Sequence, residues 1–368
     1  MEILDLRQLR SKDLAPLLEE EQRIWQSRLH WDYSHTTALI LRFVDAQALT
    51  GYAAVEGGRA VGYSFFVCED HKGLIGDAFV SNSFRNGATE VRLMTHVIET
   101  LQATPGIRRI EAQLMNFGGE PVRQWFASQG FQSYGRKFMC RGLENGLPNF
   151  PNSNQSHDRQ GVVNPDQAPF PTRHPEVEIA GWDPRWFSEA ARLITRTYHG
   201  HVDSEISDQY RSHVGAMRFL DNIVRYPGCG IFSSSSSFLA FGPSASLPSA
   251  TLPSAALGTG RAGRTVGIPS SLCGMVLTSV VRGRVAHITQ LCVDPEAQGL
   301  GIGSRLMDRV LERLREQDFR AVTLTVTESN QRALRFYERL RFSILNDFHA
   351  FVWDAPQEKS WLPGQGGE

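Results

Sequence analysis

The sequence predicts a mixed α/β fold (α+β in its mixed sheet), built as two domains in tandem. Its 368 residues are about twice the length of a usual domain. Strand-like and helix-like patterns alternate along the second half, and part of the first half recurs there. We therefore expect two similar α/β units in one chain.

The second half contains runs typical of strands and of amphipathic helices. The predicted strands are rich in β-branched and aromatic residues and read SFLAF, LCGMVLTSVV, HITQLCV, AVTLTVT and FHAFVW. Two further runs, GSRLMDRVLERLREQ and NQRALRFYERL, place apolar residues at helical spacing. Together these patterns predict an α/β domain over residues 177–355.

Three stretches lack such patterns. Residues 145–176 are rich in Pro, Asn, Gln and Ser, which predicts a linker. Residues 242–271 are of low complexity and carry no acidic residue, which predicts a disordered insertion in a hairpin. Residues 356–368 are expected to form a flexible tail.

An internal repeat relates the two halves. The segment VSNSFRNGATEVRLMTHVIETL (80–101) aligns without gaps on VDPEAQGLGIGSRLMDRVLERL (293–314), with 7 of 22 positions identical. Further on, WFASQGF (125–131) matches FYERLRF (336–342). Chance similarity between two amphipathic helices could explain the first match alone. The second match favours duplication, with a first domain over residues 1–144.

Composition excludes several classes of protein. Lys plus Arg number 38 and Asp plus Glu 39, a formal net charge of −1, so no overall field favours nucleic acid or an anionic membrane. The five cysteines are scattered and form no CxxC pair, which argues against a disulfide framework or a zinc site. No run of consecutive apolar residues is long enough for the core of a signal peptide or for a membrane-spanning segment. We expect a cytoplasmic protein without nucleic-acid or membrane partners.

A glycine-rich turn precedes the helix at 303–317. Such a turn leaves main-chain N–H groups open to an anion, and the helix dipole favours negative charge there. The spacing excludes a dinucleotide fingerprint, because the third glycine would fall at Ser304, and no lysine is present for a phosphate-binding P-loop. The pattern that fits is Gln-x-x-Gly-x-Gly, formed by Gln298, Gly301 and Gly303.

This pattern resembles the GNAT superfamily of acyl-CoA N-acyltransferases. The following Thr327, Asn330, Ala333 and Tyr337 fit the T-x-x-N-x-x-A-x-x-x-Y pattern of that family. The resemblance is strong over 286–342, fainter over 177–355, and degraded over about 1–142. It implies that acyl-CoA contacts a set of residues around the turn: Leu291, Cys292, Val293, Gln298, Gly299, Leu300, Gly301, Ile302, Gly303, Ser304, Asn330, Ala333 and Tyr337.

The resemblance also implies catalytic roles. Tyr337 is expected to protonate the departing thiolate, although it could instead be a packed aromatic. His287 is expected to act as the base that deprotonates the acceptor amine, although a lone strand histidine is more often structural. Asn330 could contact the cofactor, cap the following helix, or do both.

The acceptor side is expected near a polar segment, YHGHVDSEISDQYRSH (198–213). Tyr198, His199, His201 and Asp203 are candidates for binding the acceptor, against the alternative of a solvated loop. The His-x-His pair of this segment is not followed by a third and fourth ligand at the spacing of a metal site. We therefore expect no metal.

The first copy lacks the corresponding chemistry. Ala88 and Glu90 stand opposite Gly301 and Gly303, and a carboxylate there would repel a pyrophosphate. Phe126 stands opposite Tyr337 and Leu74 opposite His287. We expect a degenerate, non-catalytic first domain.

The expected activity is direct transfer of an acetyl group from acetyl-CoA to a primary amine of a small molecule or peptide. One alternative within this class is a small-molecule acyltransferase of the mycothiol synthase kind, which shares the tandem layout. A different alternative is a non-catalytic acyl-CoA-binding sensor or scaffold, although such a protein would have no need of Tyr337.

Overall fold

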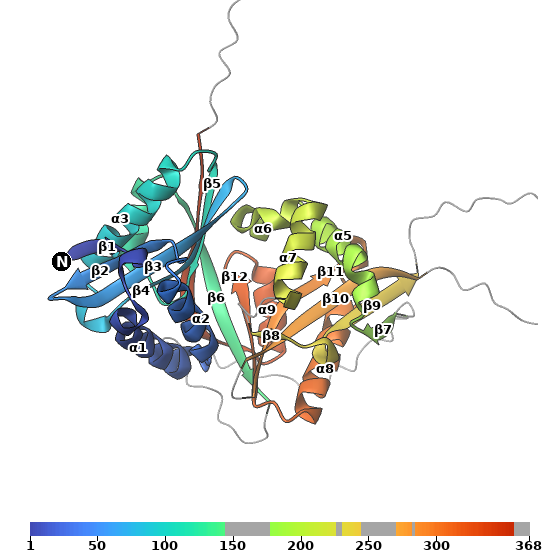
Figure 1. Cartoon of the computed structure of the whole chain (residues 1–368). Helices are drawn as coiled ribbons and strands as arrows, with labels where there is room; N and C mark the ends of the chain where they lie inside the picture. The colour runs from blue at the N-terminus through green and yellow to red at the C-terminus, as the bar shows by residue number, and fades with distance from the viewer. Residues whose placement is uncertain (144–176, 226–229, 244–269, 282–283, 357–368) are drawn as a thin grey trace, which may run out of the picture. The chain divides into compact units, whose positions relative to one another are not determined.

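A computed structural model describes residues 1–143, 177–225, 230–243, 270–281 and 284–356 (Figure 1). The predicted linker at 145–176, most of the predicted insertion at 242–271 and the tail beyond 356 lie outside these residues. The chain divides into two compact units. The first comprises Met1–Lys137, Thr327–Ser329 and Asn346–Glu368, and the second comprises Phe138–Val326 and Asn330–Leu345.

The first unit contains four α-helices among its described residues, with short 3-10 helices at Leu6–Gln8 and Asn82–Phe84. Its helices are α1 (Ser11–Leu29), α2 (Ser34–Asp45), α3 (Ala88–Ala103) and α4 (Glu120–Ser128). Its strands are β1 (Glu2–Asp5), β2 (Gly51–Glu56), β3 (Arg59–Glu69), β4 (Lys72–Val80), β5 (Arg109–Leu114), the first part of β6 (Gln132–Gly142) and most of β13 (Ser343–Asp354).

Strands of the first unit follow the order β1-β2-β3-β4-β5-β13. The pair β4/β5 is parallel and its neighbours are antiparallel. One hydrophobic cluster packs α3 and α4 on the sheet, and another packs α1 and α2 on it. The predicted strand FHAFVW is confirmed within β13, but its partner is β5 of the first unit, whereas the sequence assigned residues 177–355 to the second domain.

In the second unit, the described residues form the helices α5 (Phe187–Tyr198), α6 (Val202–Ile206), α7 (His213–Arg225), α8 (Ile302–Glu316) and α9 (Gln331–Arg339). The strands are β7 (Glu178–Gly181), β8 (Ile231–Phe232), β9 (Phe238–Pro243), β10 (Ser270–Val281), β11 (Val285–Val293) and β12 (Ala321–Thr327). Short 3-10 helices occupy Pro184–Trp186, Asp208–Arg211, Ser234–Ser236 and Pro295–Ala297.

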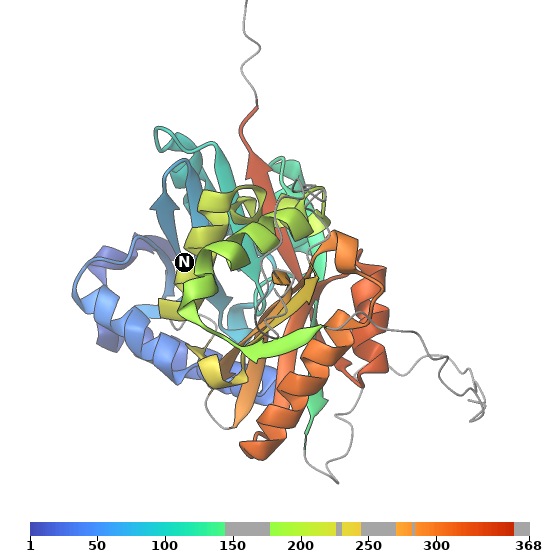
Figure 2. The same ribbon diagram turned by 90° about the vertical axis from the view of Figure 1, so that its right-hand side faces the viewer.

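The sheet of the second unit repeats the order of the first. It runs β7-β9-β10-β11-β12, with β11/β12 parallel and the other neighbours antiparallel, while β8 pairs with β10. One cluster packs α8 and α9 on this sheet, and another packs α5 and α7. In Figure 2 the orange helix α8 lies across the strands it covers.

The two copies share a β-bulge at the same repeat position. In the first unit Phe65 pairs with Asp77 and Phe66 with Ile75, so Gly76 is the extra residue of β4. In the second unit Leu277 pairs with Gln290 and Thr278 with Ile288, so Thr289 is the extra residue of β11. These two residues are 213 positions apart, the same offset as in the sequence alignment. Because a bulge needs a specific local register, this coincidence supports duplication.

The helix positions predicted to be shared also form both cores. Leu93, Met94, Val97 and Leu101 of α3 are fully buried, as are their counterparts Leu306, Met307, Val310 and Leu314 of α8. Helical spacing of apolar residues therefore predicted the buried faces correctly.

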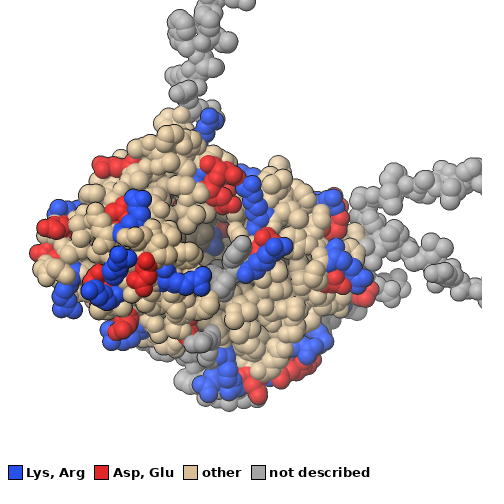
Figure 3. All heavy atoms as spheres, in the orientation of Figure 1, with Lys and Arg blue, Asp and Glu red and all other residues tan. Residues whose placement is uncertain are grey.

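Basic and acidic side chains are interspersed on the face shown in Figure 3, in keeping with the net charge of −1. Every helix among the described residues is too short or too polar to span a bilayer.

Two carboxyl groups lie together in the core of the first unit. Glu21 is fully buried, and its Oε1 accepts a hydrogen bond from the Trp25 indole at 3.1 Å. The Tyr63 hydroxyl lies 2.6 Å from Glu21 Oε2 and 2.9 Å from Asp77 Oδ2, and the Tyr33 hydroxyl donates to the same Asp77 oxygen. Burial, and then the neighbouring Asp77 carboxylate, raise the pKa of Glu21 well above its usual value.

Replacing Glu21 with Gln should make the protein more stable at alkaline pH. The folded-state pKa of Glu21 is raised, so the native state retains a proton that the unfolded chain loses above about pH 4.3. Stability from this group is therefore present at acid pH and is lost as pH rises toward the raised pKa. Gln does not ionise, so Glu21→Gln avoids the loss of folding free energy that ionisation of the buried carboxyl causes. Its Tm at alkaline pH should rise by ~2–4 °C for each kcal/mol of that free energy.

Thermal unfolding of wild type and variant over a range of pH tests this expectation. Glu19→Gln changes an exposed residue of the same helix and serves as the control. Equal Tm values for Glu21→Gln and wild type at alkaline pH would show that the buried pair is not protonated as described.

Candidate active site

The glycine-rich turn links β11 to α8 in the second unit. Gly299 and Gly301 have φ of 87° and 75°, in the left-handed region that residues with a Cβ rarely adopt. Helix α8 begins at Ile302, and the first helical hydrogen bond after the turn runs from the Arg305 N–H to the Gly301 carbonyl at 3.1 Å. N–H groups of a first helical turn have no partner within the helix, and this turn contains no acidic side chain. The arrangement suits an anion.

Gln298 connects the turn to its surroundings. Its Nε2 donates to the Val293 carbonyl at 3.2 Å, and its Oε1 accepts from Arg332 of α9 at 2.7 Å. Arg332 therefore brings a positive charge to the turn. The sequence reasoning did not single out Arg332.

Strand β11 pairs with β12 over only a short length before β11 leads into the turn. Their parallel register runs from Val285 opposite Ala321 to Ile288 opposite Leu324. The bulge at Thr289 follows directly, and Leu291–Val293 then pair with β10 on their other edge. Backbone groups near the turn are thus positioned beside the end of β12, where an extended ligand could hydrogen-bond to them.

Asn330 follows β12 by three residues and caps α9. Its Oδ1 accepts a hydrogen bond from the Ala333 N–H at 3.1 Å, which confirms the predicted helix cap. Its Nδ2 lies 3.1 Å from Nε2 of His201. The Nδ1 of the same ring lies 3.6 Å from a carboxylate oxygen of Asp203 and 3.1 Å from the Asp203 N–H.

A second group of side chains surrounds Cys292. The amide of Gln290 donates to the Tyr198 hydroxyl at 2.6 Å and to the Cys292 sulfur at 2.9 Å. The Tyr198 ring stacks on Tyr210 at 4.4 Å and meets His201 edge-on at 5.3 Å. Burial raises the pKa of the Cys292 thiol to about 12, so the thiol is protonated at neutral pH.

Tyr337 of α9 is nine-tenths buried. Burial raises its pKa above the usual tyrosine value, and the charge of Asp203 and the neighbouring Cys292 add to this effect. The phenol therefore keeps its proton at neutral pH and can serve as a proton donor.

His287 occupies a less favourable setting for a base. It is 7 % exposed, its Nδ1 lies 2.9 Å from the Thr323 hydroxyl, and its ring stacks on Phe138 at 6.0 Å. Burial lowers its pKa to about 4, so it binds a proton only weakly at neutral pH.

The structure brings most of the predicted polar residues of the acceptor segment close to residues that the sequence predicts to bind the cofactor. Tyr198, His201 and Asp203 lie beside Cys292, Asn330 and Tyr337. His199, by contrast, is exposed. Gln290, which joins Tyr198 to Cys292, was not singled out from the sequence. The bulge at Thr289 changes the alternation of β11, so a period of two along HITQLCV does not reveal which side Gln290 takes.

The corresponding turn of the first unit contains a carboxylate of its own. Glu90 lies in the first turn of α3, is 1 % exposed, and accepts a hydrogen bond from the Gly87 N–H at 2.8 Å. Phe126, the counterpart of Tyr337, is fully buried against Phe351 with ring centroids 4.0 Å apart. A side-chain carboxyl group of the protein itself thus already occupies this helix end.

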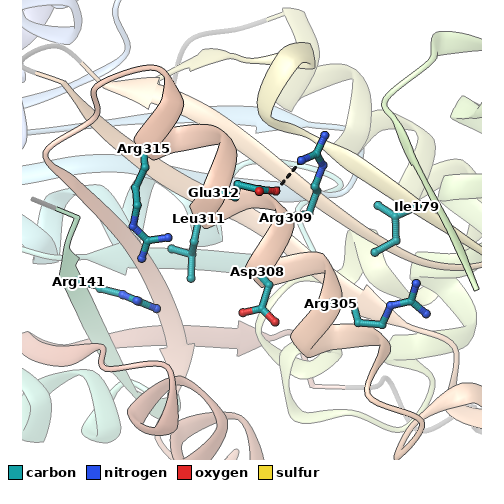
Figure 4. A pocket seen from close by; sticks show the side chains of 8 residues that line it. All are labelled: Arg141, Ile179, Arg305, Asp308, Arg309, Leu311, Glu312 and Arg315. Atoms are coloured by element: carbon teal, nitrogen blue, oxygen red, sulfur yellow. Dashed lines mark hydrogen bonds and ion pairs between the residues drawn. The ribbon is translucent and has the colours of Figure 1, made fainter. Parts of the chain in front are cut away.

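A groove of about 560 Å³ lies elsewhere, along the outer face of α8 (Figure 4). Its charged lining residues come mainly from α8, and Arg309 forms an ion pair with Glu312 at 2.6 Å. The lining comprises Arg141, Ile179, Arg305, Asp308, Arg309, Leu311, Glu312 and Arg315. None of the predicted site residues lines this groove. Over the described part of the chain, no three His, Cys, Asp or Glu side chains are grouped so as to hold a metal ion.

Comparison with known proteins finds a family match in the C-terminal part of the chain. Residues 255–342 match the model of the acetyltransferase (GNAT) family. The chain carries a GNAT domain. The glycine turn, Asn330 and Tyr337 fall within the matched residues, whereas Tyr198, His201 and Asp203 precede them.

Two relatives match parts of this chain. An uncharacterized N-acetyltransferase of Methanocaldococcus jannaschii is 34% identical over 80 residues, which are 22% of this chain and 35% of the relative. A mycothiol acetyltransferase of Thermomonospora curvata is 43% identical over 72 residues, 20% of this chain and 24% of the relative. The chain thus covers about a third or less of either relative.

The fold likeness extends over most of the chain. The crystal structure of a GCN5-related N-acetyltransferase from Sphaerobacter thermophilus has a TM-score of 0.53 and 14% identity, covering 87% of this chain and 86% of that one. The GNAT domain therefore belongs to a chain whose fold, beyond the matched residues, also resembles that of a GNAT protein.

Proposed function

We propose that the second unit is an N-acetyltransferase that uses acetyl-CoA as its co-substrate. The observation that carries this proposal is the open turn at Gly299 and Gly301, which leads into α8 beside the end of the β11/β12 pairing. Helix α9, with Asn330 as its N-cap and Tyr337 within it, contacts the turn through Arg332 and Phe336. Phosphate binding at a helix N-terminus is the expected use of such a turn.

The residues present fit coenzyme A. The N–H groups of the turn and of the first turn of α8 would hold its diphosphate, with Arg332 adding positive charge through Gln298. The backbone of Leu291–Val293 would hydrogen-bond to the pantetheine, and Asn330 and Ala333 would border it. The cofactor supplies the acetyl group as a thioester.

Side chains of the protein then assist direct transfer of the acetyl group to the acceptor amine. The lone pair of a neutral acceptor amine would form the new C–N bond while the C–S bond breaks. The nitrogen would lose one proton to solvent as it becomes the amide, and the phenolate left at Tyr337 would take one proton back from solvent. Tyr337 gives its proton to the departing sulfur, because its raised pKa keeps the phenol protonated until that moment. The lowered pKa of His287 and its contact with Thr323 favour a structural role for this residue over the base that the family resemblance implies.

Direct transfer predicts that acetyl-CoA leaves no acetyl group on Cys292. Burial raises the pKa of this thiol to about 12, so little thiolate exists at neutral pH. Intact-mass measurement after incubation with acetyl-CoA should show no adduct at this residue. Cys68, which is exposed, is replaced by Ser in all samples to remove a competing thiol. An acetyl group on Cys292 would indicate a two-step mechanism instead.

The acceptor is proposed to be a primary amine of a small molecule or peptide. Tyr198, which is bonded to Gln290, and Asp203, whose charge acts on Tyr337, supply an aromatic ring and a carboxyl group that suit a cationic amine. The first unit is proposed to be non-catalytic, because Glu90 already occupies its helix end. We also place the protein in the cytoplasm, since Cys68, Cys140, Cys273 and Cys292 are free thiols, as in a reducing compartment.

Calorimetric titration of the full chain with acetyl-CoA tests the proposal. One binding site per chain is expected, in the second unit. Two sites would show that the first unit also binds, in spite of Glu90. Absence of binding would refute the acetyltransferase assignment.

A further inference from the structure

Three arginines of the second unit carry charges that no ion pair neutralises. Arg141 of β6 and Arg315 of α8 lie at the same end of the groove along α8 (Figure 4). Arg341 lies two residues beyond the end of α9. Burial, and then the charges of Arg315 and Arg341, lower the pKa of Arg141 below its usual value. Among the described residues, none forms an ion pair or a side-chain hydrogen bond with these three guanidinium groups.

Most other charged groups of the groove already have partners. Arg309 pairs with Glu312 at 2.6 Å, and the Arg305 guanidinium donates to the Val177 carbonyl at 2.7 Å. Asp308 is the acidic residue that acts on Arg141 in the opposite sense to the other arginines. One carboxylate therefore faces three guanidinium groups, and this end of the groove has a net positive charge.

The fold does not require arginine at the position of Arg341. Its φ is 63°, its N–H donates to the Glu338 carbonyl at 2.8 Å, and the Phe342 N–H donates to the Tyr337 carbonyl at 3.0 Å. Glycine is preferred at this position of a helix end, because the left-handed conformation is unfavourable for a residue with a Cβ. The first unit has Gly130 there, with φ of 81°. Five other described residues besides glycine share this conformation, so the conformation alone assigns no site.

Arg141 has an uncharged counterpart in the first unit. Leu143 and Ala355 directly follow β6 and β13. Their N–H groups make the same backbone hydrogen bond, at 2.8 and 2.7 Å, to the residue that precedes β12 and to the one that precedes β5. Arg141 and Trp353 each stand two residues earlier, so Trp353 takes the place of Arg141 in the first unit.

The other two arginines are also replaced there. The aligned repeat, continued by one residue, places Gln102 opposite Arg315, and Gly130 stands opposite Arg341. A Cβ on Gly130 would lie 3.7 Å from Trp353, so these two positions are neighbours in the first unit as well. The arginine cluster thus belongs to the second unit alone and is not needed to form the shared fold. Arg315 also complements the dipole at the end of α8, but this reason does not extend to Arg141 or Arg341.

We propose that Arg141, Arg315 and Arg341 bind a multivalent phosphate anion in the groove along α8, at a site separate from the glycine-rich turn. A planar guanidinium group can donate two parallel hydrogen bonds to a phosphate. At 1.5 Å per residue, α8 rises about 20 Å between Ile302 and Arg315, which separates this cluster from the turn. The groove volume of about 560 Å³ leaves room for an organic group on the phosphate. This site goes beyond the proposed acetyl transfer and does not depend on it.

Calorimetric titration of the full chain with pyrophosphate tests the proposal. The titration is made in the Gly303→Glu background, in which the turn is expected to be closed to anions, and one binding event should remain. In that background Arg141→Gln and Arg315→Gln should each weaken pyrophosphate binding by roughly 10-fold or more. Arg313→Gln is the matched control, because this arginine of α8 lies outside the groove and pairs with Glu316 at 2.9 Å. Its pyrophosphate affinity should not change.

Absence of pyrophosphate binding in Gly303→Glu, or equal affinity in all three arginine variants, would overturn the proposal. Acetyl-CoA affinity, measured with Gly303 intact, should be the same in Arg141→Gln as in wild type. A parallel loss of acetyl-CoA binding would assign the arginines to the co-substrate and would also overturn it. If wild type bound no acetyl-CoA, the proposed function would fail, while the pyrophosphate titration would still decide whether this site exists.

Arg341→Gly gives a second readout that a merely structural arginine would not. Glycine adopts the left-handed conformation freely, so the Tm of this variant should rise by ~2–4 °C. Its pyrophosphate affinity should nevertheless fall, because one of the three charges is lost. A raised Tm with unchanged pyrophosphate affinity would refute the role of Arg341 in the site.

Discussion

Replacing Tyr337 with Phe should lower turnover by roughly 10²–10⁴-fold and leave acetyl-CoA affinity nearly unchanged. The substitution removes one hydroxyl and keeps the ring that meets Phe336 and Phe342 at 5.2 and 5.8 Å, so the packing of α9 is retained. Without the phenol, the sulfur must leave as an unprotonated thiolate or take its proton from water. Thiol release measures turnover, and calorimetry measures affinity.

This experiment also separates an enzyme from an acyl-CoA sensor, which has no turnover to lose. Tyr134→Phe removes a hydroxyl from β6 in the first unit, where it bonds to Gln132, and is the matched control. If Tyr337→Phe turned over as fast as wild type, the proton donor would have to be another group.

Replacing Gly303 with Glu should weaken acetyl-CoA binding by at least ~100-fold. A Cβ at this position would lie 3.7 Å from Phe336 and from Val293, an ordinary contact distance, so the backbone of α8 tolerates a side chain. The loss is therefore expected from charge, because the carboxylate would compete with the diphosphate for the first turn of the helix. Glu90 shows this situation in the first unit.

Gly303→Gln has nearly the same size without the charge and separates the two causes. Its binding should fall much less than that of Gly303→Glu in the same calorimetric titration. Equal losses for Gln and Glu would mean that bulk, rather than charge, blocks the turn. Wild-type affinity in Gly303→Glu would place the cofactor elsewhere.

Local patterns predicted strands β9 to β13 and helices α8 and α9, but they named none of β7, β8, α5, α6 and α7. The α8 and α9 helices begin and end within a residue or so of the runs chosen for them, and the cap at Asn330 is confirmed. These features depend on residues close in sequence, such as the spacing of Leu306 and Val310. The internal repeat likewise predicted which residues of α3 are buried.

Features that join distant segments were not predictable in this way. The contact between His201 and Asn330 links residues 129 positions apart, and no periodicity encodes it. The pairing of β13 with β5 was missed because alternation identifies a strand but not its neighbour. The bulge at Thr289 is a third case, since one extra residue leaves no compositional signal.

The carboxylate of Glu90 has a consequence for how each half responds to metabolite supply. The first unit has a carboxyl group of its own in the first turn of α3, whereas the first turn of α8 contains no acidic side chain. By mass action, a ligand that binds only the folded second unit stabilises that unit in proportion to the logarithm of its concentration. If the second unit binds acyl-CoA and the first does not, as proposed, the stability of the second half would follow the cellular acyl-CoA concentration and that of the first half would not.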